Sequence, residues 1–177
     1  MQWELELIKI IQSIQNGFFD MFFWIISLFA SFLGAFLLFI FFLFFANKKF
    51  AIYYALCTTI NVCFNYILNF FFNRPRPFEI DANIINKAEA LGQSFPSGHM
   101  ICATTMIIFL IIFILQKCKK KWTKIFLVAL CILFLIFVAI SRMYLGQHYF
   151  TDILSGILLS IILTISLANL VKKQLII

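Results

Sequence analysis

The residues that could do chemistry in this 177-residue chain are confined to three short polar segments. Every histidine, arginine and proline lies in one of them, at residues 72–78 (FNRPRPF), 95–99 (FPSGH) or 141–152 (SRMYLGQHYFTD). A guanidinium group offers a planar fork of donors that grips a phosphate bidentately, whereas an ammonium group acts as a hydrated point charge. Arginines placed only beside the two imidazoles therefore indicate an oxyanion site. In the competing interpretation, Arg74, Arg76 and Arg142 merely snorkel at membrane edges.

The rest of the chain is strongly apolar. Hydrophobic residues make up 64% of the sequence and charged residues 12%, and no soluble domain of this length could bury so much apolar surface. The chain is therefore expected to be a multi-pass membrane protein with the lipid bilayer as its surroundings. The formal net charge of +7 does not indicate nucleic acid, because nine of the eleven lysines lie at the ends of apolar segments, where they set topology. The five scattered cysteines have no metal-ligand spacing.

The pattern of apolar residues predicts an all-α membrane bundle of about five transmembrane helices. A spanning helix needs about 20 apolar residues, and such segments lie at residues 18–46, 50–72, 100–115, 125–140 and 153–171. The first segment is long and is expected to tilt, whereas the third and fourth must borrow flanking polar residues. The sequence contains no internal repeat or low-complexity linker, so a single domain is expected over residues 1–177.

Two further helices are predicted at the membrane surface. Residues 3–14 predict an amphipathic helix in the interface, with Trp3, Leu7, Ile10, Ile11 and Ile14 on one face and Glu4, Glu6, Lys9 and Gln12 on the other. A short helix is also expected between the first two polar segments, because four apolar residues there have helical spacing: Ile84, Ile85, Ala88 and Leu91. Asp81 is expected to cap that helix.

The distribution of lysine predicts the orientation in the membrane. If five spans alternate, the lysines at residues 48–49, 117–124 and 172–173 all fall on one side. The positive-inside rule assigns that side to the cytoplasm and the N-terminal helix to the outside. The three polar segments then meet on the external face of the cell membrane.

The polar segments also carry a family resemblance. RPRPF, FPSGH and SR-x5-H-x3-D, in this order and at helix ends, resemble the type 2 phosphatidic acid phosphatase (PAP2) superfamily, which includes glucose-6-phosphatase and the vanadium haloperoxidases. The resemblance covers about residues 20–156, with the motif-bearing region at about 66–156. It implies a helical bundle that hydrolyses phosphoesters or phosphoanhydrides through a phosphohistidine, without a metal or another cofactor.

The catalytic residues implied by the resemblance suit that chemistry. His148 and Asp152 are four residues apart and would share one face of a helix. A carboxylate there can hold one imidazole nitrogen as N–H and leave the other free to attack phosphorus, although Asp152 would also suit a helix N-terminus. By resemblance, His148 is the nucleophile, Asp152 its orienting partner and His99 the general acid. The alternative is a facial metal site built from the same three residues, which the neighbouring arginine cations disfavour.

The phosphate-binding residues follow from the same resemblance. Arg76 and Arg142 match the family's phosphate-binding arginines, and Ser97 and the N–H of Gly98 would add donors at the start of a helix. Asn69 stands where the family usually has lysine. An amide can still bind a phosphate oxygen but supplies no charge.

The role of Arg74, two residues before the motif arginine, is left open by the sequence. It could support the phosphate site from behind or contact a lipid headgroup.

Together these residues predict a lipid phosphate phosphatase at the external membrane face. The small extramembrane mass argues against a bulky polar substrate, and no obligate protein partner is indicated. Undecaprenyl diphosphate is the first expected substrate, with phosphatidylglycerol phosphate and phosphatidate as alternatives. Asn69 leaves open a weakly active lipid-binding or lipid-translocating protein on the same scaffold. A vanadate-dependent oxidase is a remote third hypothesis, because such enzymes are large and soluble.

Overall fold

A computed structural model describes residues 2–89 and 92–170, and all regular elements within these ranges are α-helices. They are α1 (Gln2–Gln12), α2 (Gly17–Phe29), α3 (Phe32–Phe45), α4 (Lys48–Phe72), α5 (Pro77–Ile80), α6 (Gly98–Lys117), α7 (Lys121–Tyr144) and α8 (Phe150–Leu170). Four helices, α4, α6, α7 and α8, are long and apolar enough to cross a membrane, and α2 with α3 forms a fifth span if the bent pair counts as one. The predicted all-α membrane bundle is confirmed.

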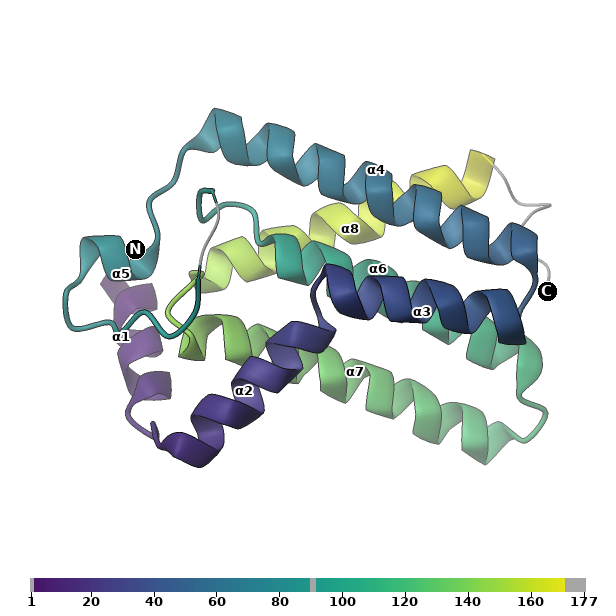
Figure 1. The fold of residues 1–177 in the computed structure, drawn as a ribbon, viewed down its shortest axis with the longest axis horizontal. Coiled ribbons are helices and arrows are strands. Elements are labelled where there is room, and N and C mark those ends of the chain that lie inside the picture. Colours follow the sequence, from purple (N-terminus) through teal and green to yellow (C-terminus); the bar gives the residue numbers. More distant parts are fainter. Residues whose placement is uncertain (1, 90–91, 171–177) are drawn as a thin grey trace.

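The long helices run side by side along the molecule, and α1 crosses one end of the bundle (Figure 1). Helix α6 lies in the middle, packed against α3, α4, α7 and α8. Two buried polar contacts tie α6 and α4 to α8: Thr105 of α6 shares a 2.9 Å hydrogen bond with Ser160, and Asn61 Nδ2 of α4 donates to Thr164 Oγ1 at 3.2 Å. Small polar side chains commonly link helices in membranes, where lipid offers them no partner.

Asparagine caps set both ends of α4, which leads into the first polar segment. Asn47 accepts a 2.8 Å hydrogen bond from Phe50 N at the N-terminus. Asn73 ends the helix in the left-handed conformation (φ 43°), which asparagine tolerates better than most residues. Pro75 and Pro77 follow, and Pro77 occupies the first turn of α5, where its missing N–H costs nothing.

The long first apolar segment is broken, which the sequence did not predict. Helices α2 and α3 meet at an angle of 52°. At the junction, Ser31 Oγ donates to Leu28 O at 2.6 Å and accepts from Leu33 N at 3.3 Å, so its side chain caps both helices. Glycine is required at Gly34, because a Cβ there would lie 1.8 Å from the Phe29 carbonyl oxygen. The bend directs α2 toward the end of the bundle that holds the polar segments.

The predicted N-terminal helix is present as α1, with its edge docked against the protein. Glu4, Ile8 and Gln12, which follow one another at intervals of four, are all buried. Gln12 Nε2 donates to Ile85 O and Tyr144 O at 2.8 and 2.9 Å, and Gln12 Oε1 accepts from Ile85 N at 3.0 Å. Of the apolar face predicted to meet the membrane, Trp3, Ile10 and Ile14 are exposed, whereas Leu7 and Ile11 are half-buried against the core.

The predicted short helix at residues 84–91 is wrong for the residues that the structure describes. Residues 81–89 and 92–97 contain no helix, and Leu91 lies outside the described residues. The cause is that tertiary partners take the backbone amides: Gln12 accepts from Ile85 N, and the Leu145 carbonyl accepts from Lys87 N at 3.2 Å. Asp81 closes a turn by accepting from Asn83 N at 2.9 Å.

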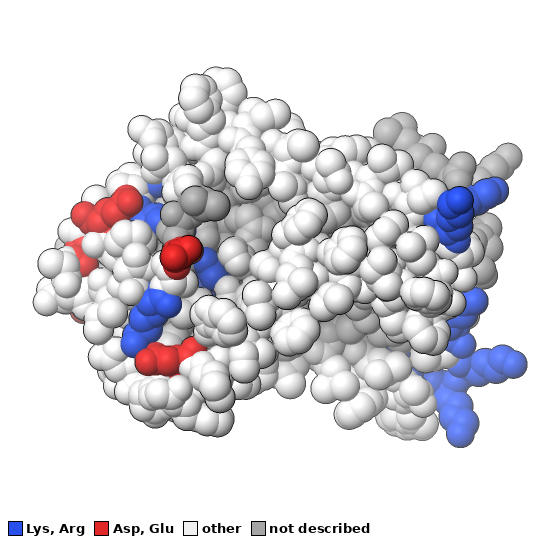
Figure 2. All heavy atoms as spheres, in the orientation of Figure 1, with Lys and Arg blue, Asp and Glu red and all other residues white. Residues whose placement is uncertain are grey.

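Charged residues gather at the two ends of the molecule, with an uncharged band between them (Figure 2). In this view, the end where α3 meets α4 and α6 meets α7 carries only positively charged side chains. The other end carries both positively and negatively charged side chains. The lysines at 172–173 lie outside the described residues. This separation matches the predicted convergence of the polar segments on the face opposite the lysines.

Candidate active site

The three polar segments converge around a cavity of about 420 Å³ at one end of the bundle. Its lining takes at least one residue from each segment, namely Arg76, Pro96, Gly98, His99, Arg142, Gln147 and His148. Residues far apart in the sequence therefore share one cavity, as the alternation of spans predicted.

His148 lies in the short connection between α7 and α8 and is 3% exposed. Its Nδ1 lies 2.8 Å from the Ser94 carbonyl oxygen, which can only accept, so Nδ1 carries the proton and Nε2 keeps its lone pair. The pKa of His148 is lowered to about 4, mainly by burial. The charges of Arg142 and Arg76 contribute to this lowering, while Asp152 opposes it. The imidazole is thus neutral at pH 7, with a nucleophilic nitrogen available.

Asp152 is linked to His148 through Ser94 rather than by the direct hydrogen bond that the sequence suggested. The carboxylate is fully buried, and its Oδ2 lies 3.8 Å from His148 Nδ1. Oδ2 instead accepts from Ser94 Oγ and, at 2.9 Å, from Tyr149 N. Ser94 thus binds Asp152 through its hydroxyl and His148 through its carbonyl. The bond to Tyr149 N also makes Asp152 a cap of α8.

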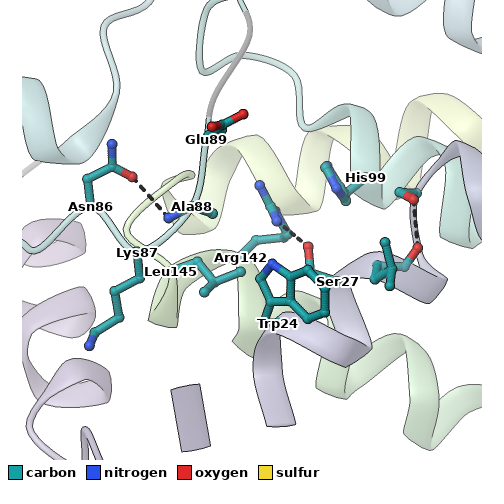
Figure 3. Close-up of a pocket in the computed structure, with 11 residues that line it drawn as sticks. Trp24, Ser27, Asn86, Lys87, Ala88, Glu89, His99, Arg142 and Leu145 are labelled. Atoms are coloured by element: carbon teal, nitrogen blue, oxygen red, sulfur yellow. Dashed lines mark hydrogen bonds between the residues drawn. The ribbon is translucent and has the colours of Figure 1, made fainter. Parts of the chain in front are cut away.

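His99 and Arg142 line a second, adjoining cavity of about 720 Å³ as well as the first. Figure 3 shows both side chains beside Ser27 and Trp24 of α2, with Glu89 across the opening. Arg142 Nη1 donates to Ser27 Oγ, a partner supplied by the bent α2. His99 stands in the first turn of α6, half-buried, between the two cavities. This position suits a proton donor for a group that departs from the first cavity into the second.

Two buried donors at the site lack a hydrogen-bond partner among the described residues. They are Arg142 Nε and Ser97 Oγ. A buried donor without a partner costs about 1–3 kcal/mol, so each such group calls for an explanation, of which a bound ligand is one. Both belong to the residues predicted to bind phosphate.

The other predicted arginine, Arg76, is held firmly by the surrounding backbone. Its Nη1 donates to the carbonyl and the side-chain oxygen of Gln147, both at 3.1 Å, and its Nε donates to Gly92 O at 3.2 Å. Gln147 in turn donates to Asn86 Oδ1 at 2.7 Å. Arg76 therefore faces the cavity in a fixed orientation and also links the loop before α6 to the loop before α8.

Asn69 lines the cavity, but its amide is engaged with the loop that carries the PSGH turn. Its Nδ2 donates to Phe95 O at 3.0 Å and Pro96 O at 3.3 Å, and its Oδ1 accepts from Gln93 N at 2.7 Å. One helical turn earlier, Asn65 Nδ2 donates to Pro96 O at 2.9 Å. The two asparagines of α4 thus clamp the backbone of the turn.

The PSGH turn is also fixed from the side of α8. Ser97 N donates to Asp152 O at 3.1 Å, and Gly98 begins α6. A Cβ at Gly156 would lie 2.8 Å from Ser97 O and 3.0 Å from Met100 Cβ, so glycine permits this close approach of α8. The turn is therefore held by α4 on one side and α8 on the other.

Several residues of the site were missed by the sequence analysis. Ser94 and Gln147 act largely through backbone or amide contacts that no pattern reveals, although Ser94 directly precedes FPSGH and Gln147 lies within the third polar segment. Ser27 gave no signal at all within an apolar helix. Among the described residues, no three His, Cys, Asp or Glu side chains come together as a possible metal site.

The fold and cavity define a membrane-embedded helical bundle that presents histidine and arginine side chains at one end. The PAP2 superfamily model matches residues 50–176, and the chain belongs to this superfamily of membrane phosphatases.

Two solved structures resemble the chain over nearly its full length. Aquifex aeolicus LpxE is 27% identical, with a TM-score of 0.77, over 93% of this chain and 94% of that one. A transmembrane PAP2-type phosphatidylglycerolphosphate phosphatase from Bacillus subtilis is 19% identical, with a TM-score of 0.79, over 97% of this chain and 86% of that one. No match was found among curated protein sequences.

Proposed function

We propose that the protein is a metal-independent phosphatase of membrane lipid phosphates or diphosphates, working through a phosphohistidine. The observation that carries this proposal is the pair of unpartnered buried donors, Arg142 Nε and Ser97 Oγ, at a site that also holds the neutral His148 imidazole. Donors fixed in advance around an oxyanion stabilise the charge that develops during phosphoryl transfer.

In the first step, His148 Nε2 attacks phosphorus and a P–N bond forms. The bond between phosphorus and the leaving oxygen breaks, and His99 gives that oxygen a proton. The proton stays on His148 Nδ1, which keeps donating to the Ser94 carbonyl, so the positive charge of the phosphoimidazole is stabilised where it develops. Arg76 and Arg142 hold the remaining phosphoryl oxygens.

In the second step, water attacks the phosphohistidine on phosphorus. His99, now neutral, accepts a proton from the water, and the P–N bond breaks. Inorganic phosphate leaves, and both imidazoles return to their starting protonation states. The same group thus serves as acid in one step and base in the next.

A lipid substrate is supported by the surroundings of the two cavities. Trp24 and Leu28 of α2 border the larger cavity and Phe32 of α3 borders the smaller one, so both reach the break between these helices. Large apolar side chains are exposed along α2 and α3, as expected for contact with acyl or isoprenoid chains. A headgroup would enter sideways at this break while its lipid tail stays in the bilayer.

The external face of the cytoplasmic membrane is the proposed side of the site. Lys48 and Lys49, together with four lysines around the α6–α7 turn, are exposed at the opposite end of the bundle. The positive-inside rule then assigns the histidines and arginines to the outside.

Asn69 supports a second candidate, a lipid-binding or lipid-translocating protein. Its amide is bound to loop backbone, so this chain brings no additional cation to the phosphate from that position. Such a protein would bind a lipid phosphate without releasing phosphate.

The test is phosphate release by the detergent-purified protein in excess EDTA. The panel contains undecaprenyl diphosphate, which heads the list of expected substrates, phosphatidylglycerol phosphate, phosphatidate, and a soluble phosphomonoester as the non-lipid control. We expect turnover of at least one lipid, its persistence in EDTA and its inhibition by orthovanadate. Binding without release would favour the second candidate, and activity that disappears with EDTA and returns with a divalent ion would contradict the proposed chemistry.

A further inference from the structure

The N-terminal helix brings a buried carboxylate to the back of the catalytic site. Glu4 is only 3% exposed. Its Oε1 accepts from Thr151 N at 2.9 Å and from Thr151 Oγ1 at 2.8 Å, and its Oε2 accepts from Arg74 Nη2 at 3.3 Å. Thr151 is the residue before Asp152, so Glu4 contacts the first turn of α8 directly.

Arg74 joins this carboxylate to the one beside the nucleophile. Its Nη1 donates to Asp152 Oδ1 and, at 2.8 Å, to Thr151 Oγ1. Its guanidinium carbon lies 4.0 Å from the centre of the Tyr149 ring, in a cation–π contact. Among the described residues, the cavity that holds His148 is lined by Arg76 and Arg142 but not by Arg74. Arg74 therefore binds the carboxylates of Glu4 and Asp152 and does not line the cavity.

These contacts form one continuous chain from α1 to the nucleophile. Glu4 binds Arg74, Arg74 binds Asp152, Asp152 accepts from Ser94 Oγ, and the Ser94 carbonyl accepts from His148 Nδ1. Buried charges are tolerated only where they are paired and hydrogen-bonded. A planar guanidinium can bridge two carboxylates in a fixed geometry, which a lysine ammonium cannot do.

Hydrogen bonds near both ends of α1 hold its polar edge against the protein. The helix turns Trp3 and Ile10 outward while Glu4, Ile8 and Gln12 face the protein. Gln12 fastens the other end of the helix to Ile85 and Tyr144. Both ends of the buried edge are thus anchored by hydrogen bonds, with Glu4 at the end nearest the site.

We propose that Glu4 and Arg74 are positioning residues for the phosphatase reaction, so that the docked N-terminal helix completes the active site. This inference rests on the proposed function. Glu4 fixes Arg74, and Arg74 fixes the Asp152 carboxylate that holds Ser94 and thereby the imidazole of His148. Neither residue touches the substrate.

The test compares Glu4→Gln with Glu6→Gln in the full-length protein. Glu6 lies on the same helix, but its side chain is 59% exposed and pairs only with Lys9 within the contacts that the structure describes. We expect Glu4→Gln to lower kcat about tenfold with KM nearly unchanged, because the substrate contacts remain while the nucleophile is less well held. Glu6→Gln should behave like the wild type.

A double-variant cycle separates positioning from simple stabilisation. Arg74→Lys keeps the positive charge but loses the planar guanidinium group. We expect it to lower kcat more than Glu4→Gln does. If Glu4 acts through Arg74, the double variant should be no slower than Arg74→Lys alone. Losses that multiply, or a Glu4→Gln variant with a lower melting temperature and an unchanged kcat for its folded fraction, would overturn the inference.

The outcome also separates this inference from the proposed function. If the wild type releases no phosphate from any lipid in the panel, the proposed function fails, and the positioning role fails with it. If the wild type is active and Glu4→Gln is equally active, only the positioning role fails.

Discussion

The two ends of this protein use positive charge in opposite ways. At one end, Lys48, Lys49 and the lysines of the α6–α7 turn are mostly exposed. At the other end, Arg76 and Arg142 are 5% and 3% exposed and their side chains are held by named partners. Exposed ammonium groups need only be present to bias insertion, because the positive-inside rule concerns charge near a span and not its geometry. Buried guanidinium groups must be oriented if they are to bind one anion in one geometry, as we propose for Arg76 and Arg142.

This contrast predicts that substitutions at the two ends will have different kinds of effect. Changes at the arginine and histidine end should alter chemistry in purified protein. Changes at the lysine end should alter how the chain inserts and leave the chemistry intact.

The largest expected effect is the loss of the nucleophile. His148→Ala should reduce turnover at least about 10³-fold, as for other enzymes that lose the nucleophile, while lipid binding remains measurable. His99→Ala should slow the reaction about 10²–10⁴-fold, most for poor leaving groups that need protonation. Phosphate release from two substrates with good and poor leaving groups measures both effects. A His99→Ala variant with equal losses on both would remove His99 from the role of proton donor.

A smaller loss of kcat/KM is expected when residue 142 keeps a positive charge but loses the planar guanidinium group. Arg142→Lys removes Nε, the buried donor that has no partner among the described residues, and the bond to Ser27. Hydrogen bonds to charged groups contribute about 1.5–3 kcal/mol, so kcat/KM should fall by about 10–150-fold. Steady-state kinetics with one lipid phosphate measure the change. Ser27→Ala is the matched control, and it should cost less because Nε remains. Equal activity in wild type and Arg142→Lys would mean that a charge alone suffices at this end.

Asn69→Lys tests whether a family-like cation would help this site. Phosphate binding by Asn69 was predicted from the resemblance, and a lysine facing the phosphate would then increase the rate. The observed clamp on Gln93, Phe95 and Pro96 leads us to expect the opposite. Loss of these bonds should lower the melting temperature and reduce kcat, measured on the same preparation. A tenfold gain in kcat/KM would place the side chain at the phosphate instead.

The pH dependence of stability should carry the signature of the buried His148. The pKa of His148 is about 4 in the folded protein against an ordinary value of 6.5. Between these pH values the unfolded chain binds more protons than the folded one, so the free energy of unfolding must fall as the pH falls. The pKa difference corresponds to about 3 kcal/mol. Melting temperatures from pH 7 to pH 4 should therefore decline less for His148→Gln than for the wild type. Parallel curves would contradict the buried neutral imidazole.

The smallest effect on chemistry is expected at the lysine end. Lys119→Gln combined with Lys120→Gln should leave kcat and KM of the purified protein unchanged. Reporter fusions after Lys49, Lys87 and Lys121 should read cytoplasmic, external and cytoplasmic in the wild type. A cytoplasmic signal at Lys87 would place the histidines inside and contradict the proposed orientation.

Features that depend on residues close together in the sequence were predicted, whereas features that depend on distant partners were not. Spans are a property of contiguous apolar residues, so all of them were found, and the motif histidines and arginines were found because their spacing is distinctive. The bend between α2 and α3 depends on the Ser31 side chain and on the close approach at Gly34, neither of which alters hydropathy. The predicted helix near Ile84 failed because partners from other segments took its amides.

Glu4 and Ser94 were missed for the same reason, whereas Arg74 was noted and its role left open. Glu4 lies about 70 residues from Arg74 in the chain. In the sequence alone it is one of the polar residues on the outer face of a predicted interfacial helix. Ser94 acts on His148 through its backbone carbonyl, which is the same atom in every residue type. Only the folded chain shows that the two ends of this network meet.

The central claim, that His148 is the nucleophile of a lipid phosphatase, is tested most directly by trapping the phosphoenzyme. The purified protein would be mixed with a lipid substrate carrying ³²P in its terminal phosphate and quenched in alkali, which preserves phosphohistidine, and the labelled residue would be mapped by digestion. We predict label on His148 in the wild type and none in His148→Ala. Turnover by the wild type without label on His148, or label that persists in His148→Ala, would contradict the mechanism.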